Sequence, residues 1–284
     1  MNIKEIKSVE LSSFTTMITG ISIIFSIIST IIIAAALMIF VPTSSSLILY
    51  LIPTIIVGTF MYTIYNSFCE GLLYNILSKK LKTIAIALED GKIVKISTTE
   101  TAMMVSIILT IQVILLYLVS VLVLPIFLSS IMQTMMLAGQ QMIAYSIYQL
   151  VMLLSQPTTI IMIIFGVFII TFVFTLLGTY IYNFIAKSGR CVEVNLSEEN
   201  RLTQINSINS LKLGIAFGII CGVLGIILGV ISIVSGGNAT RLIIDIIMGF
   251  IGGFVEAYLF AVFYNFLVGK LGKIKLELID YKIN

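Results

Sequence analysis

Histidine and tryptophan are absent from this 284-residue sequence, and charged residues make up only 10% of it. The lack of histidine removes the commonest general base and the commonest metal ligand. A soluble domain usually carries about 25% charged residues, so this chain has too few for a water-facing surface. Cys69, Cys191 and Cys221 follow no disulfide or metal-ligand spacing. We therefore expect no metal, no cofactor and no enzymatic site, and the net charge of +3 does not favour nucleic acid as a partner.

Hydrophobic residues are abundant, at 59% of the chain, and they gather in six long runs. A helix needs about 20 apolar residues to cross a bilayer. The runs predict spans at about 14–40, 48–78, 102–128, 158–186, 211–234 and 242–268. The predicted fold class is an all-α membrane bundle of six transmembrane helices, with the lipid bilayer as its first partner.

Lysine and arginine predict the direction of these spans. Of the 16 basic residues, all except Arg241 fall beside the same helix ends or in the segments that join them. Basic residues gather on the cytoplasmic side of membrane proteins. We expect a multi-pass protein of the cell membrane with both termini in the cytoplasm. The segment 129–157 is then an uncharged outer insertion that lies along the membrane interface or re-enters the membrane.

The even-numbered spans reveal a threefold repeat when they are aligned by their last turns. The aligned pairs are Tyr74-Asn75, Tyr182-Asn183 and Tyr264-Asn265. Nine residues after each asparagine begins an alternating apolar segment: Ile84, Ile86, Leu88; Val192, Val194, Leu196; Ile274, Leu276, Leu278. Alternation of this kind predicts a strand, and a similar strand precedes each odd-numbered span. The repeats are 1–90, 91–198 and 199–284, with short cytoplasmic β-strands at their ends that form a small sheet.

Each repeat-equivalent pair allows two interpretations. Tyrosine commonly lies at headgroup depth, so the tyrosines are expected at the interface. The amide of a buried asparagine needs hydrogen-bond partners. The three asparagines are expected to bond either to the strands below them or to one another around a pseudo-threefold axis.

Small residues follow one face of the last two spans. The fifth span carries Gly214, Gly218 and Gly222, and the sixth carries Gly249 and Gly253. Helices in lipid associate through close backbone approach and interhelical hydrogen bonds. These glycines therefore predict tight packing of the fifth span against the sixth.

The end of the second repeat, Ile181–Leu196, reads Ile-Tyr-Asn-Phe-Ile-Ala-Lys-Ser-Gly-Arg-Cys-Val-Glu-Val-Asn-Leu. It resembles the signature of an uncharacterised prokaryotic family of short membrane proteins, in which Tyr-Asn is followed by glycines and by Val-Glu-Val-x-Leu. The third repeat is similar around Gly272, whereas the first lacks the glycines. The resemblance implies a unit of two transmembrane helices with a strand at each end, and it implies no activity.

Three acidic residues lie in or near the predicted spans: Glu70, Asp245 and Glu256. Ionisable residues are expensive inside a membrane and mark candidate functional sites. Glu256 is the deepest of the three and is either a hydrogen-bonded structural group or an ion or proton site. Asp245 is one turn from Arg241 and is expected to pair with it. Glu70 either lines a hydrated crevice or points to the cytoplasmic interface.

These features favour a non-enzymatic scaffold that binds a cytoplasmic or membrane protein partner through its small-residue helix faces and its cytoplasmic strands. The alternative is a channel or transporter for a small ion or solute, with a path between the three repeats that uses Glu70, Glu256 and the asparagines.

Overall fold

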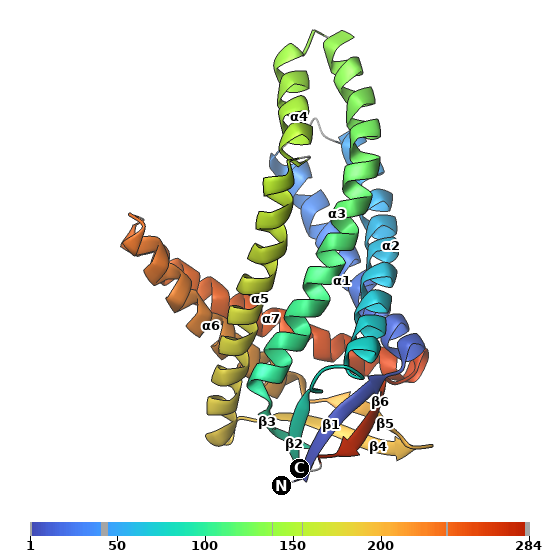
Figure 1. The fold of residues 1–284 in the computed structure, drawn as a ribbon, viewed down its shortest axis with the longest axis vertical. Coiled ribbons are helices and arrows are strands. Elements are labelled where there is room, and N and C mark those ends of the chain that lie inside the picture. Colours follow the sequence, from blue (N-terminus) through green and yellow to red (C-terminus); the bar gives the residue numbers. More distant parts are fainter. Residues whose placement is uncertain (1, 41–44, 138, 155, 237, 282–284) are drawn as a thin grey trace. The chain divides into compact units, whose positions relative to one another are not determined.

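The computed structural model describes residues 2–40, 45–137, 139–154, 156–236 and 238–281. The chain divides into two compact units, one of Met1–Met104 with Leu176–Asn284 and the other of Val105–Thr175. The helices are α1 (Leu11–Phe40), α2 (Ser45–Leu77), α3 (Thr98–Leu137), α4 (Gln141–Leu154), α5 (Pro157–Lys187), α6 (Ser210–Val234) and α7 (Ala239–Leu271) (Figure 1). The strands are β1 (Asn2–Val9), β2 (Ala85–Glu89), β3 (Lys92–Ile96), β4 (Val192–Glu199), β5 (Leu202–Ile208) and β6 (Lys275–Asp280).

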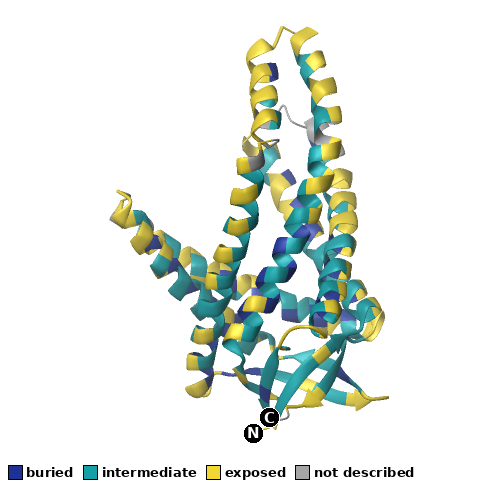
Figure 2. Ribbon diagram, in the orientation of Figure 1, coloured by how far each residue is buried: buried dark blue, intermediate teal, exposed yellow. Residues whose placement is uncertain are grey.

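Six of the helical segments are long and apolar enough to cross a membrane. They are Leu11–Phe40, Leu51–Leu77, Thr98–Val123, Thr158–Lys187, Ser210–Val234 and Leu242–Leu271. Large hydrophobic side chains on them are exposed; Ile31 and Ile32 of α1, for example, are each 63% exposed (Figure 2). Such a surface suits lipid and not water. The six helices therefore fit a multi-pass membrane protein.

The strands overturn the predicted all-α fold class. All six strands form one closed antiparallel barrel in the order β1-β2-β3-β4-β5-β6 (Figure 1). The fold combines helices with a barrel and is not an all-α bundle with small strands at its ends. The physical reason for closure is that an open sheet leaves a row of unpaired N–H and C=O groups at each edge, and closing the sheet removes both edges.

The barrel alternates pairings within the predicted repeats and between them. Within the repeats, β1 pairs with β2, β3 with β4 and β5 with β6. Between the repeats, β2 pairs with β3 and β4 with β5, and β6 closes the barrel on β1. Every pairing is antiparallel, and each helical segment begins at the end of one strand of the barrel and returns to the next strand.

Two tight turns join β2 to β3 and β4 to β5, the strands between consecutive predicted repeats. Asp90 and Gly91 adopt φ values of 47° and 75°, which are the left-handed values that a two-residue hairpin requires. The second turn uses Asn200 and Arg201, with φ values of 52° and 68°. Asp-Gly is a strong hairpin signal in a sequence, whereas Asn-Arg is a weak one because arginine seldom adopts positive φ.

The apolar core of the first unit lies where the helices meet the barrel. One cluster joins Met17 and Ile21 of α1 to Tyr264 and Leu267 of α7 and to Ile274. A second cluster is built from α5, the segment around β4 and α6. Its buried members are Tyr182, Ala186, Cys191, Val192 and Ala216. These contacts attach the helix ends to the barrel.

The uncharged insertion 129–157 is largely helical. Residues 129–137 continue α3, which reaches 40 residues, and α4 takes up Gln141–Leu154. Positions 138 and 155, within the insertion, lie outside the described residues. The insertion therefore lengthens the helical segment of the second unit.

A charged contact reinforces the closing pair of strands, β1 and β6. Lys7 Nζ donates to Glu277 Oε1 at 2.8 Å, and Ser8 Oγ donates to Glu277 Oε2 at 2.9 Å. These hydrogen bonds hold the pKa of the Glu277 carboxyl below its ordinary value. A carboxyl whose pKa is lower in the folded state stabilises the fold above its unfolded pKa, and the contribution is lost as the pH falls through the folded pKa.

We expect the melting temperature of the purified protein to fall on acidification. Part of this fall should come from protonation of Glu277. Glu277→Gln removes the charge, so this variant should melt lower than wild type at pH 7 and lose less between pH 7 and pH 3. The pair is partly exposed, so the effect is below about 1 kcal/mol. Glu198→Gln, at a residue that contacts Lys4 from an exposed position, is the matched control. Identical acid profiles for Glu277→Gln and wild type would contradict the assignment.

Candidate functional site

The three tyrosines of the repeat-equivalent pairs make the same hydrogen bond. Each hydroxyl donates to a carbonyl oxygen in the strand that opens its own repeat: Tyr74 to Ile6 at 2.5 Å, Tyr182 to Ile93 at 2.5 Å and Tyr264 to Ile205 at 2.6 Å. The hydroxyls of Tyr182 and Tyr264 also accept from the backbone N–H groups of Val192 and Ile274, at 3.2 and 3.3 Å. A single hydroxyl thus bridges the two strands of a repeat.

These tyrosines are buried inside the protein. Tyr74, Tyr182 and Tyr264 are 7%, 4% and 0% exposed. Their rings fill the junction between helix and barrel, and their depth relative to a membrane stays a prediction. A buried hydroxyl needs a hydrogen-bond partner, and the strand carbonyls supply it.

Each asparagine side chain bonds to the last residue of the same opening strand. The side-chain oxygen accepts from that residue's N–H and the side-chain NH₂ donates to its carbonyl: Asn75 with Val9 at 2.8 and 2.8 Å, Asn183 with Ile96 at 2.8 and 2.8 Å, and Asn265 with Ile208 at 2.9 and 2.8 Å. The amide imitates one more peptide unit of a neighbouring strand. Of the two arrangements that the sequence left open, the described side chains adopt bonding to the strands.

We call these three Tyr-Asn pairs, with the strand residues that they bond, the strand clamps. Each clamp lies where an opening strand ends and its helix begins, so it satisfies backbone groups that the barrel ladder no longer reaches. Unpaired backbone groups are costly when water is excluded, and more so beside hydrocarbon. The clamps therefore hold the ends of α2, α5 and α7 against the strands β1, β3 and β5.

The acidic residues do not form a comparable cluster. The Glu70 carboxylate accepts from Asn66 Nδ2 of its own helix at 2.7 Å. Asp245 is half-buried on α7, and the side chain of Arg241, its expected partner, lies outside the described residues. Glu256 is exposed in the middle of the apolar segment Leu242–Leu271. The described residues contain no group of three or more His, Cys, Asp or Glu able to hold a metal ion.

The predicted packing glycines lie in the contact between α6 and α7. A methyl group added at Gly214 or Gly218 would lie 3.1 Å from atoms of Phe254, and one at Gly222 would lie 3.4 Å from Phe250. On α7, a methyl group at Gly249 would lie 2.7 Å from the carbonyl oxygen of Cys221. Gly253 faces the same residue, where the added atom would lie 2.7 Å from Sγ. These helices touch backbone to backbone.

The sequence suggested strands as partners of the asparagines, but it did not identify the strand residues that each clamp bonds. Ten residues separate each tyrosine from the first residue of the closing segment, Ile84, Val192 or Ile274, and this constant spacing is visible in the sequence. The opening strands lie 68, 89 and 59 residues before their tyrosines. No local pattern links residues so far apart at unequal distances.

The fold defines a class: a multi-pass helical chain whose helices rise from a closed six-stranded barrel. Comparison with known family models, curated proteins and solved structures gives no match for this chain. The function is therefore argued from the geometry of the clamps, the helix faces and the barrel.

The clamps predict a specific loss of stability. Asn183→Ala removes both hydrogen bonds to Ile96 and leaves its N–H and C=O without these partners. We expect a loss of about 1–3 kcal/mol, measured as a lower melting temperature of the purified protein. Asn195→Ala, at an exposed asparagine of the same repeat, is the control. Equal melting temperatures for the two variants would show that the clamp does not stabilise the fold.

The helix contact gives a second prediction from two glycines of α7. Gly249→Ala places a methyl group against the Cys221 carbonyl oxygen, whereas nothing lies within 4 Å of a methyl group at Gly252. Overpacking of this kind costs about 1–3 kcal/mol. Gly249→Ala should lower the melting temperature and Gly252→Ala should not. A similar change in melting temperature for both variants would show that α6 does not pack closely against Gly249.

Proposed function

We propose that this chain is a non-enzymatic scaffold of the cell membrane that binds a membrane protein partner through the exposed face of α7. In this proposal the barrel and both termini lie in the cytoplasm, because the basic residues gather beside the barrel ends of the spans. The three hairpins 1–90, 91–198 and 199–284 are copies of one unit, which the three equivalent strand clamps support. The likeness of Ile181–Leu196 to the short prokaryotic membrane family is part of the same proposal.

The observation that carries the proposal is the exposed position of Glu256. It lies in the middle of Leu242–Leu271, with exposed Val255 beside it and exposed Gly252 one turn away. A carboxylate at the centre of a bilayer costs about 2.5–3.5 kcal/mol on insertion scales. The adjoining face of α7, which carries Gly249 and Gly253, is already taken by α6. A transmembrane helix that brings a hydrogen-bond donor to Glu256 would remove much of this cost.

The surroundings of Glu256 suit a helix as the occupant. A methyl group added at Gly252 would have nothing within 4 Å of it, so a neighbouring backbone can approach closely there. Small residues beside a polar group are typical of helix contacts in membranes. The partner is therefore expected to present a Lys, Arg, Asn or Gln side chain from an apolar helix.

The transport alternative depends on the same carboxylate. A titratable group at mid-membrane is also what a proton or ion path uses. Glu70 already accepts a hydrogen bond from Asn66 of its own helix, and the three asparagines are engaged by the strands. These contacts favour the scaffold over a path that needs Glu70 and the asparagines free.

A photo-crosslinking residue at Val255, introduced in native membranes, tests the proposal. We expect one discrete adduct with a membrane protein, weakened at least about tenfold by Glu256→Leu and largely kept by Glu256→Gln, which can still form hydrogen bonds. The same probe at Ile32, an exposed residue of α1, is the control for nonspecific capture.

Three outcomes would overturn the scaffold. One is the same adducts at Val255 and Ile32, and a second is an adduct that Glu256→Leu leaves unchanged. The third is ion or proton flux through reconstituted vesicles that Glu256→Gln abolishes, which would establish the transport alternative. An adduct between two copies of this chain would identify the partner as the protein itself.

A further inference from the structure

The helices meet the barrel at three places, which we call corners. Each corner lies between the end of one helix and the start of another: α7 and α1, α5 and α6, and α2 and α3. At the corner of α7 and α1 the space is filled by Met17, Ile21, Leu267 and their neighbours. At the corner of α5 and α6 it is filled by a second apolar cluster around Ala186 and Ala216. The corner of α2 and α3 instead contains a cavity of about 720 Å³. This volume lies in the range of small-ligand sites.

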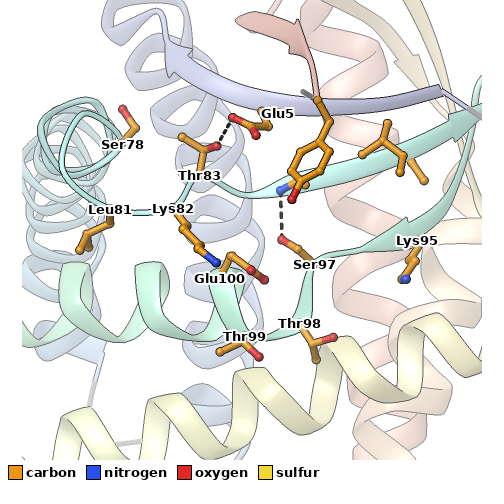
Figure 3. Close-up of a pocket in the computed structure, with 14 residues that line it drawn as sticks. Glu5, Ser78, Leu81, Lys82, Thr83, Lys95, Ser97, Thr98, Thr99 and Glu100 are labelled. Atoms are coloured by element: carbon orange, nitrogen blue, oxygen red, sulfur yellow. Dashed lines mark hydrogen bonds between the residues drawn. The ribbon is translucent and has the colours of Figure 1, made fainter. Parts of the chain in front are cut away.

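The cavity exists because α2 ends early. Helices α5 and α7 continue to Lys187 and Leu271, four and six residues past their clamp asparagines, whereas α2 ends at Leu77, two residues past Asn75. The chain from Ser78 to Thr83 then forms one wall as a loop. Two small side chains of β2, Ala85 and Ala87, also line the cavity. The first turn of α3 forms the opposite wall (Figure 3).

The lining is polar and carries charges of both signs. It includes Lys82 and Lys95, Glu5 and Glu100, and hydroxyl groups from both walls (Figure 3). Glu5 is already engaged, since its Oε2 accepts from Thr83 Oγ1 at 2.6 Å. Within the described part of the chain, the side chains of Lys82, Lys95 and Glu100 form no ion pair. Lys82 and Glu100 project into the cavity from its two walls (Figure 3).

We propose that this cavity binds a phosphodiester that carries a primary ammonium group, the headgroup chemistry of phosphatidylethanolamine. Lys82 and Lys95 supply donors for the phosphate, and Glu100 accepts from the ammonium. The formal charges of the lining cancel, which matches a zwitterion better than an anion. The inference rests on the proposed membrane placement, since the cavity lies at the ends of two spans, at the depth of lipid headgroups.

The chemistry separates this ligand from two related headgroups. A choline group has no N–H to donate to Glu100, so phosphatidylcholine retains only the phosphate contacts. Phosphatidylglycerol brings a net negative charge, which Glu100 opposes. The selectivity for an ammonium therefore depends on Glu100, and the affinity for the phosphate depends on Lys82.

Native mass spectrometry of the purified full chain, with the three lipids at matched acyl chains, tests the assignment. We expect phosphatidylethanolamine to bind about tenfold or more tightly than phosphatidylcholine, as for the loss of a charge-assisted hydrogen bond. Glu100→Gln should reduce phosphatidylethanolamine to the level of phosphatidylcholine, whereas Lys82→Gln should weaken both. Lys80→Gln, in the same loop but outside the lining, should change neither.

A cavity-filling variant, Ser78→Phe, provides a second test if a charge variant fails to fold. Its phenyl ring enters the cavity from the loop, so lipid binding should be abolished. The melting temperature should stay unchanged. Soluble glycerophosphoethanolamine distinguishes a lipid ligand from a free metabolite with the same headgroup chemistry. If it displaces the lipid at an equal concentration, the ligand is a free metabolite. If it does not displace the lipid, the ligand is the lipid.

A preference for phosphatidylglycerol, or lipid binding unchanged in Lys82→Gln, Glu100→Gln and Ser78→Phe, would overturn the proposal. The measurement uses the purified chain without a protein partner. Its failure therefore leaves the crosslinking test at Val255 unaffected.

Discussion

The structure depends on satisfying backbone hydrogen bonds where strands give way to helices. Barrel closure pairs the strand edges, but it cannot reach the residues at which the chain leaves the ladder. The clamp asparagines supply an amide there that accepts and donates as a peptide would. The clamp tyrosines tie the opening strand to the span that returns. The clamps therefore attach the ends of the returning spans to the barrel.

Local patterns predict the parts of this fold and not their closure. Period-two alternation predicted the strands, and the Asp90-Gly91 pair is a local signal of its turn, because both signals come from neighbouring residues. The pairing of β6 with β1 joins residues such as Ser8 and Glu277, 269 positions apart, and no periodicity carries that information. Two strands per repeat suggested only a small sheet. Whether such strands end at open edges or close on themselves is decided by tertiary geometry.

The residues of the candidate site could be predicted from the sequence, but their surroundings could not, because these depend on tertiary structure. Aligning the spans singled out the tyrosines and asparagines, since repeated residues at constant spacing stand out against Ile and Leu. Hydropathy placed Glu256 and Glu70 in the spans but could not separate them, because exposure depends on the neighbouring helices. Glu70 accepts a hydrogen bond from its own helix, whereas Glu256 is exposed. The open corner was invisible because its cause is the early end of α2, in a repeat that aligns without gaps.

Closure also limits how the proposed scaffold could recognise a partner. An open cytoplasmic sheet would accept an added strand from another protein, a mode in which main-chain hydrogen bonds provide affinity. A closed barrel has no edge to offer, so recognition must use side chains. In the proposed orientation these are the lysines and carboxylates of the barrel, the open corner beside α2, and the helix faces within the lipid. Among them, Glu256 is the group whose own chain leaves its charge exposed in the middle of an apolar span, which is why the partner is sought inside the membrane.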